Sequence, residues 1–200
     1  MAWRMFWKMQ SLLLHKDASL NSRLRLFDAT LGSCALWCAE SWTLRRTDEE
    51  QLQVAQRSML RRIVKVVRYP DEAWVEWIKR ATARALVVAA AAKVRDWVST
   101  HYERKWRWAG HVARRSDTAL VWRATTWRDA EWCAMTAEAG LRRATRPSRR
   151  RWMKFEASLV SFCNGHGMGW WTAAAQQRQQ WEEWAKMYGE FVQKGQGCSE

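Results

Sequence analysis

The segment from Thr47 to Pro70, TDEEQLQVAQRSMLRRIVKVVRYP, sets the expectation for the fold. Its apolar residues recur every three or four positions, which is the period that lines one face of an α-helix. The members of this apolar stripe are Leu52, Ala55, Met59, Leu60, Ile63 and Val67. The pattern predicts a helix that opens with a capping box formed by Thr47 and Glu50 and ends before Pro70.

The other face of this predicted helix is cationic. Its members are Arg57, Arg61, Arg62, Lys65 and Arg68. Cations spaced by three and four residues can follow a phosphate backbone, so we interpret the first four as candidate contacts to nucleic acid. An ordinary solvated helix face is the alternative interpretation, and the two are evenly balanced on the sequence.

The composition favours a helical protein that attracts polyanions. The chain has 200 residues with only 2 Pro and 9 Gly, and its formal net charge is +14 at pH 7. Low Pro and Gly contents favour helices, and a strongly basic chain attracts polyanions. We therefore expect a mostly α fold with RNA or DNA as the partner, against the alternative of a basic but inert surface.

Periodicity predicts the remaining organisation of the chain. Helices are expected over about 20–38, 74–98 with a break near Lys93, 101–115, 150–162 and 170–192. We expect a poorly ordered leader over residues 1–18, a helical domain over 19–115, and a looser basic helical extension over 116–200.

No apolar run approaches the roughly 20 residues of a membrane span, so we expect no membrane partner. Five cysteines without a regular framework favour a reducing compartment, so we expect a nuclear or cytoplasmic protein. The basic, amphipathic start from Met1 to Lys8 gives only weak support for a mitochondrial presequence.

The segment Trp106–Arg115, WRWAGHVARR, combines flat aromatic rings with cations. Aromatic rings can stack on bases while arginines contact phosphates. We interpret four of its residues as a mixed stacking and phosphate patch: Trp106, Arg107, Arg114 and Arg115. The alternative is that at least one tryptophan packs in the core, because many of the 17 Trp in the chain occur at helical spacing.

The segment from Arg142 to Lys154 contains seven basic residues and no acidic one. Like charges this close repel unless something neutralises them, and each phosphate contacted there would release counterions. The predicted strongest anchor for nucleic acid comprises Arg142, Arg143, Arg146, Arg149, Arg150 and Arg151.

No pattern typical of a catalytic centre occurs in the sequence. Cys163 and His166 are one ligand pair, whereas structural zinc requires four ligands. None of the four histidines has a nearby cysteine or serine together with an orienting carboxylate in a recognisable catalytic pattern, and a phosphate-binding glycine loop is missing. We therefore expect no catalysis, no metal and no cofactor.

Several motifs resemble one family. Leu24–Phe27, Ala39–Leu44 and Leu52–Ile63 resemble the segment that follows the polymerase palm in LINE-type (non-LTR) retrotransposon reverse transcriptases. Further motifs of the same polyproteins are similar to Trp106–Arg114, Arg146–Trp152 and Trp171–Trp184. The resemblance covers about 20–195 and implies a thumb-like helical region over 19–115 with a C-terminal extension that helps grip template RNA or target DNA. The palm and endonuclease of the full elements have no counterpart in this sequence.

The sequence also departs from the family pattern. Gly32-Ser33 stands where a proline is usual, Trp37-Cys38 where Tyr-Gly is usual, and Thr145 where glycine precedes the Arg-Pro pair. The zinc knuckle of some relatives is missing. Two alternatives to nucleic-acid binding therefore stay open: a helical protein-interaction module, and a decayed element copy without a selected function. The sequence leaves the choice between RNA and DNA and the oligomeric state undetermined.

Overall fold

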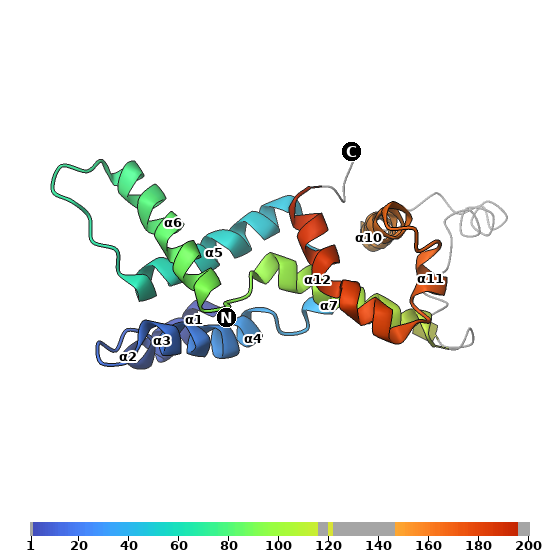
Figure 1. Cartoon of the computed structure of the whole chain (residues 1–200), viewed down its shortest axis with the longest axis horizontal. Coiled ribbons are helices and arrows are strands. Elements are labelled where there is room, and N and C mark those ends of the chain that lie inside the picture. Colours follow the sequence, from blue (N-terminus) through green and yellow to red (C-terminus); the bar gives the residue numbers. More distant parts are fainter. Residues whose placement is uncertain (1, 116–119, 122–146, 196–200) are drawn as a thin grey trace. The chain divides into compact units, whose positions relative to one another are not determined.

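The computed structural model describes residues 2–115, 120–121 and 147–195, of which 147–154 are described by their backbone only. Within these ranges every regular element is a helix, which confirms the prediction of a mostly α fold (Figure 1). The chain divides into two compact units, Met1–His101 and Tyr102–Glu200. This division falls inside α7 (Trp97–Ala113) and not at the expected residue 115, because Trp106 and Ala109 already belong to the core of the second unit.

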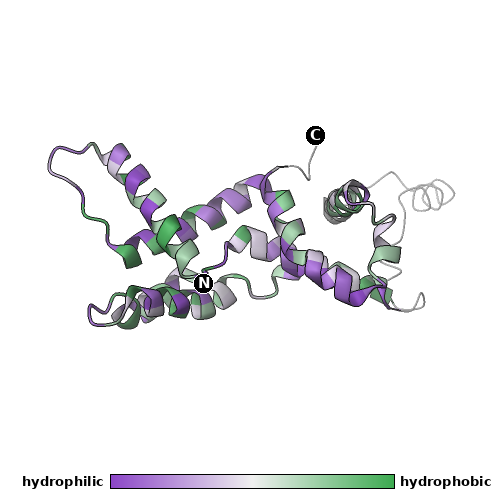
Figure 2. Ribbon diagram, in the orientation of Figure 1, coloured by the Kyte–Doolittle hydropathy of each residue, from purple (hydrophilic) through white to green (hydrophobic). Residues whose placement is uncertain are grey.

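The first unit contains the N-terminal helices and one long helical pair. Its elements are α1 (Ala2–Lys8), α2 (Gln10–Leu13), α3 (Leu20–Phe27), a π-helical turn (Asp28–Gly32), α4 (Ser33–Ala35), a 3₁₀ turn (Ala39–Ser41), α5 (Arg46–Val64) and α6 (Trp74–Ala91). Both α5 and α6 carry an apolar stripe beside polar faces (Figure 2). The apolar face of α5 packs against α3 and α6 and buries Met59, Leu60 and Ile63.

Residues 2–13 form α1 and α2, so the expectation of a poorly ordered leader is wrong for this stretch. Phe6 and Leu13 have no exposed surface and join the same core as Leu24 and Phe27. Burial of large apolar side chains contributes about 1.5–3 kcal/mol each, which favours an ordered segment. Part of the core that buries them lies on α3, which explains why the pattern within residues 1–18 did not reveal this order.

Both ends of α5 differ from the prediction. The N-terminal cap lies two residues earlier than expected, because the backbone N–H of Arg45 donates to the Asp48 carboxylate at 2.9 Å. The helix ends at Val64, since Lys65 adopts the left-handed conformation with a φ of 53°. Lys93 adopts a similar φ of 59° just after α6, which confirms the predicted break near this residue.

The buried side chain of Gln56 fixes the start of α7 against α5. Its amide nitrogen donates to the carbonyl oxygen of Arg95 at 2.8 Å, and its amide oxygen accepts from the backbone N–H of Trp97 at 3.1 Å. Asp28 accepts two further hydrogen bonds from Arg95, one from its backbone N–H and one from its guanidinium, both at 3.1 Å. The connection between α6 and α7 is therefore held by hydrogen bonds from two other elements of this unit.

The second unit comprises most of α7, α10 (Pro147–Gly165), α11 (Trp171–Ala174) and α12 (Arg178–Gln193). The single helix expected over 170–192 is thus two helices. The core is built on Trp106 and Trp181, whose rings stack with centroids 3.8 Å apart. The indole N–H of Trp106 donates to the carbonyl oxygen of Trp181 at 2.7 Å, and that of Trp181 donates to the carbonyl oxygen of Trp106 at 3.0 Å. This reciprocal pairing satisfies both buried indoles.

Gly110 allows this pairing. A Cβ at Gly110 would lie 2.3 Å from the indole nitrogen of Trp181, closer than atoms can approach. We expect Gly110→Ala to lower the stability of the second unit by about 1–3 kcal/mol, because the buried indole must shift. Urea unfolding of the purified chain measures this change.

The matched control is Gly165→Ala at the last residue of α10, where no atom lies within 4 Å of the added Cβ. This variant should be neutral or more stable by up to about 1 kcal/mol, since alanine is the better helix former. Equal stabilities for the two variants would contradict the packing described for Trp181.

Candidate nucleic-acid interface

Arg57 and Arg61 lie one turn apart on α5, and both are half-buried. The Arg61 guanidinium donates to the hydroxyl of Thr82 on α6 at 2.9 Å, and the Arg57 guanidinium donates to the side-chain oxygen of Gln53 at 3.2 Å. Both acceptors are neutral. These contacts position the two guanidinium groups without neutralising their charge.

Arg62 completes a cluster of like charges with these residues, which we call the α5 arginine cluster (Arg57, Arg61 and Arg62). The pKa of Arg61 is lowered from its usual value, first by burial and then by the charges of Arg62 and Arg57. A guanidinium stays protonated at physiological pH, so the repulsion persists in the folded protein. An anion bound at this cluster would relieve that repulsion.

The four candidate contacts on the helix do not share one face, contrary to the expectation. The guanidinium of Arg62 lies over the rings of Trp3 and Trp7 on α1, at 5.6 and 5.2 Å from their centroids. Arg61 instead contacts α6, and Lys65 is exposed beyond the end of the helix. The cations therefore border α5 on two sides, which follows from the 100° rotation between neighbouring helical residues.

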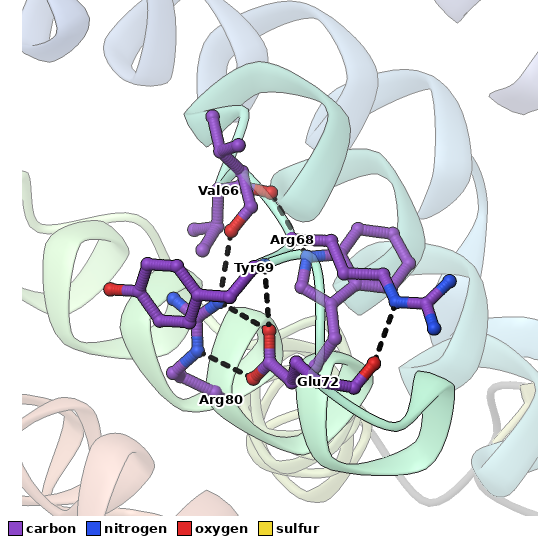
Figure 3. Close-up of polar contacts among 7 residues, drawn as sticks. Val66, Arg68, Tyr69, Glu72 and Arg80 are labelled. Atoms are coloured by element: carbon purple, nitrogen blue, oxygen red, sulfur yellow. Dashed lines mark hydrogen bonds and ion pairs between the residues drawn. The ribbon is translucent and has the colours of Figure 1, made fainter.

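The loop that joins α5 to α6, residues 65–73, is held by an ion pair between Glu72 and Arg80 (Figure 3). The Arg80 guanidinium donates two hydrogen bonds to the Glu72 carboxylate, at 2.8 and 2.7 Å. The same carboxylate accepts from the backbone N–H of Tyr69 at 3.2 Å. Because Arg80 donates to it, the pKa of Glu72 is lowered below its usual value.

Further hydrogen bonds attach the backbone of this loop to α6. The indole N–H of Trp77 donates to the carbonyl oxygen of Val66 at 3.0 Å, and Arg80 donates to that of Val67 at 2.9 Å. Within the loop, the Arg68 guanidinium donates to the carbonyl oxygen of Glu72 at 2.9 Å. The loop is therefore an ordered surface, and it presents cations and aromatic rings that periodicity and motifs in the sequence did not reveal as a site.

The predicted patch at Trp106–Arg115 is largely a packing motif. Trp106 has no exposed surface, so the prediction that its ring stacks on a base is wrong, and the alternative of core packing holds. Arg107 pairs with the carboxylates of Glu182 and, at 3.6 Å, Glu103. These carboxylates neutralise the charge that we assigned to a phosphate contact.

The other two arginines of that segment differ from each other. The Arg114 guanidinium donates to the carbonyl oxygen of Ala175 at 2.6 Å, and its pKa is lowered chiefly by burial. Arg115 is exposed and lies 2.9 Å from the imidazole of His111. Arg115 therefore stays a candidate phosphate contact, whereas Arg114 contributes to packing between α7 and the residues after α11.

The third predicted site falls mostly outside the described part of the chain. Arg142, Arg143 and Arg146 lie outside the described residues. Arg149, Arg150 and Arg151 belong to the first turns of α10, but their side chains also lie outside the described atoms. Binding by this segment stays a prediction.

The chain shows sequence similarity to a transposon-derived protein. Over 110 residues the chain is 29% identical to an uncharacterized transposon-derived protein of Caenorhabditis elegans. The match covers 55% of this chain and 37% of the length of that relative, and it supports a transposon origin. No family model and no solved structure matches the chain. Among the described residues, no helix has the length and apolar character that crossing a membrane requires.

The order of the α5–α6 loop should depend on the Glu72 carboxylate. We expect Glu72→Gln to speed hydrogen exchange of the Tyr69 amide by about three- to tenfold at neutral pH, since a charged acceptor is lost. The lowered pKa of Glu72 means that its contribution is complete above the usual pKa of glutamate and is lost as the pH falls through the lowered value. The difference between wild type and variant should therefore vanish in acid.

Glu76→Gln provides the control, because Glu76 makes a single exposed contact with Lys79 at 2.9 Å on the same helix. Exposed pairs of this kind contribute little, so exchange of the Tyr69 amide should stay at the wild-type rate. Equal exchange in both variants would show that Glu72 does not order the loop.

Proposed function

We propose that this chain is a nucleic-acid-binding part of a retrotransposon reverse transcriptase, which holds template RNA or target DNA through phosphate contacts. The observation that carries the proposal is the α5 arginine cluster, where Arg57 and Arg61 contact neutral groups and keep their full charge. The transposon-derived relative and the motifs similar to LINE-type reverse transcriptases support the same setting.

The chemistry of the cluster suits a phosphate backbone. Guanidinium groups donate planar, paired hydrogen bonds to phosphate oxygens and are more weakly hydrated than lysine ammonium groups. Charges that already repel one another lose part of this unfavourable interaction when an anion binds near them. A polyanion also releases its condensed counterions on binding, which adds a favourable entropy that falls with rising salt.

We assign binding and not catalysis to these residues. The motifs from Leu24 to Ile63 are similar to regions downstream of the polymerase palm. The arginines and Lys65 of α5 can bind phosphates, but catalysis would also require a nucleophile or paired carboxylates that hold metal ions. In this proposal, polymerisation requires the palm of a complete element, while the helical pair α5–α6 contacts the nucleic acid that the palm copies or extends.

A protein-interaction module is the second candidate, and exposed tryptophan favours it. Trp37 is 72% exposed and Trp7 is 48% exposed, whereas such large rings are usually buried. Light scattering before and after nuclease treatment separates the two functions. Assembly that persists after nuclease treatment supports protein contacts, and assembly that is lost supports nucleic acid.

Neutralising the cations of α5 should weaken nucleic-acid binding and reduce its dependence on salt. In the variant, Arg57, Arg61, Arg62 and Lys65 are all replaced by glutamine. If each contacts one phosphate of a single strand, the slope of log affinity against log salt should become shallower by about 3. Fluorescence anisotropy with a labelled oligonucleotide measures both quantities.

The control variant removes the same number of charges elsewhere on the first unit, by replacing four exposed cations with glutamine: Arg4, Lys8, Lys16 and Arg25. Its slope should stay near the wild-type value, apart from a small general effect of net charge. Identical slopes for the two variants would show that α5 makes no specific phosphate contacts. Thermal melts establish that both variants are folded.

Neutralising the basic segment should have the larger effect. Replacing Arg142, Arg143, Arg146, Arg149, Arg150 and Arg151 by glutamine should make the salt slope shallower by about 4, because six phosphate contacts are lost. The same anisotropy titration checks this prediction. Unchanged affinity and slope in this variant would remove the segment from the interface.

A further inference from the structure

The α5–α6 loop and the start of α6 expose large apolar side chains. Tyr69 is 62% exposed and Trp74 is 60% exposed, while Val67 and Val75 are 76% and 53% exposed. We call these four residues the loop surface. Exposed apolar residues that form a contiguous patch mark interaction sites, and these four residues lie within a short stretch of chain.

The ring of Tyr69 is held in place before any partner binds. The Arg80 guanidinium lies 4.2 Å from the centroid of the ring, and Arg80 is itself fixed by its two hydrogen bonds to Glu72 (Figure 3). The backbone N–H of Tyr69 donates to the same carboxylate. A ring fixed in this way loses little conformational entropy when it stacks on a ligand.

The charge around the loop surface favours an anionic partner. From Arg57 to Arg84 the chain carries eight cationic and three anionic side chains. Two of the anionic residues already have cationic partners, since Glu72 pairs with Arg80 and Glu76 pairs with Lys79. The α5 arginine cluster and Lys65 precede the loop in the chain, so the cations and the exposed rings belong to one continuous stretch.

Exposed aromatic rings together with exposed cations are a combination that binds single-stranded nucleic acid. Every base has a flat face that can stack on an aromatic ring, whereas the bases of a duplex are stacked on each other and paired. Lys65 and Arg68 are exposed and lie close to Tyr69 in the chain, so they can contact the phosphates of the same strand. A guanidinium on one face of Tyr69 also leaves the remaining surface of that ring for a base.

We propose that the loop surface binds unpaired bases of single-stranded RNA or DNA, with Tyr69 and Trp74 each stacking on a base. The α5 arginine cluster then contacts the adjoining phosphates. This inference rests on the proposed nucleic-acid-binding function and adds to it a preference for unpaired over paired strands.

The experiment compares two double variants of the full chain. Tyr69→Leu with Trp74→Leu keeps apolar side chains but removes both flat rings, and Tyr69→Phe with Trp74→Phe keeps a ring at each position. The probes are a labelled single-stranded oligonucleotide and a blunt duplex of the same sequence, each in RNA and DNA form. Both residues are largely exposed, so the substitutions should leave the fold intact, as thermal melts will verify.

The leucine variant should lose about ten- to a hundredfold in affinity for the single strand, because base stacking is lost at two positions. Its affinity for the duplex and the salt slope for both probes should match wild type, and the phenylalanine variant should keep most of its affinity for the single strand. Equal losses on single strand and duplex, or no loss on either, would overturn the inference.

The arms of this experiment separate failure of the inference from failure of the proposed function. If the leucine variant matches wild type while the α5 variant loses its salt dependence, nucleic-acid binding stands and base stacking at the loop surface is wrong. If wild type binds neither probe at low salt, both proposals are wrong.

Binding to vesicles that contain an anionic phospholipid is measured as a further test. If the leucine variant loses binding to vesicles but not to either nucleic-acid probe, the loop surface binds a membrane and the inference is overturned.

Discussion

Burial of one face of α5 against α3 and α6 is the constraint that organises the first unit. Met59, Leu60 and Ile63 are buried there, and Gln56 on the same helix fixes the start of α7. Since apolar packing and a buried amide set the rotation of α5, its arginines must lie along the margins of that packed face. Apolar burial offsets their mutual repulsion, and the repulsion stays available to favour an anionic ligand.

The tryptophans serve two different purposes, core packing and surface exposure. In the second unit, Trp106 and Trp181 stack and satisfy each other's indole N–H groups, so they build the core and offer no surface to a ligand. In the first unit, Trp74 is exposed at the start of α6, next to a loop fixed by Glu72. The abundance of tryptophan is therefore partly structural, and only the exposed rings are suited to recognition.

Local patterns predicted the helices well and the site poorly. The stripe around Met59 predicted α5, because a period of 3.6 residues is a property of a single segment. Order in residues 2–13 was missed, since Phe6 and Leu13 are buried by residues from other helices. The Glu72–Arg80 ion pair joins a loop to a helix, so it depends on how the loop folds and not on a spacing within one regular element.

The roles of the tryptophans show the same limit of sequence reasoning. Trp106 and Trp108 occur in one short motif with similar neighbours. The ring of Trp106 is buried because it contacts Trp181, which lies 75 positions further along the chain. The sign of this pairing within the motif itself is Gly110, because a side chain at this position would collide with the indole of Trp181. By contrast, charge patterns are visible directly in sequence, which is why the cations of α5 could be named from the sequence alone.

The proposed function requires that arginines of this chain contact a polyanion, and a salt titration of the unmodified chain tests that requirement. Binding of a labelled single-stranded oligonucleotide is measured from low to physiological salt concentration. We expect tight binding at low salt and a slope of log affinity against log salt of about −3 or steeper, as several phosphate contacts require. Failure of the folded chain to bind at low salt, or an affinity that salt does not change, would show that the arginines make no such contacts.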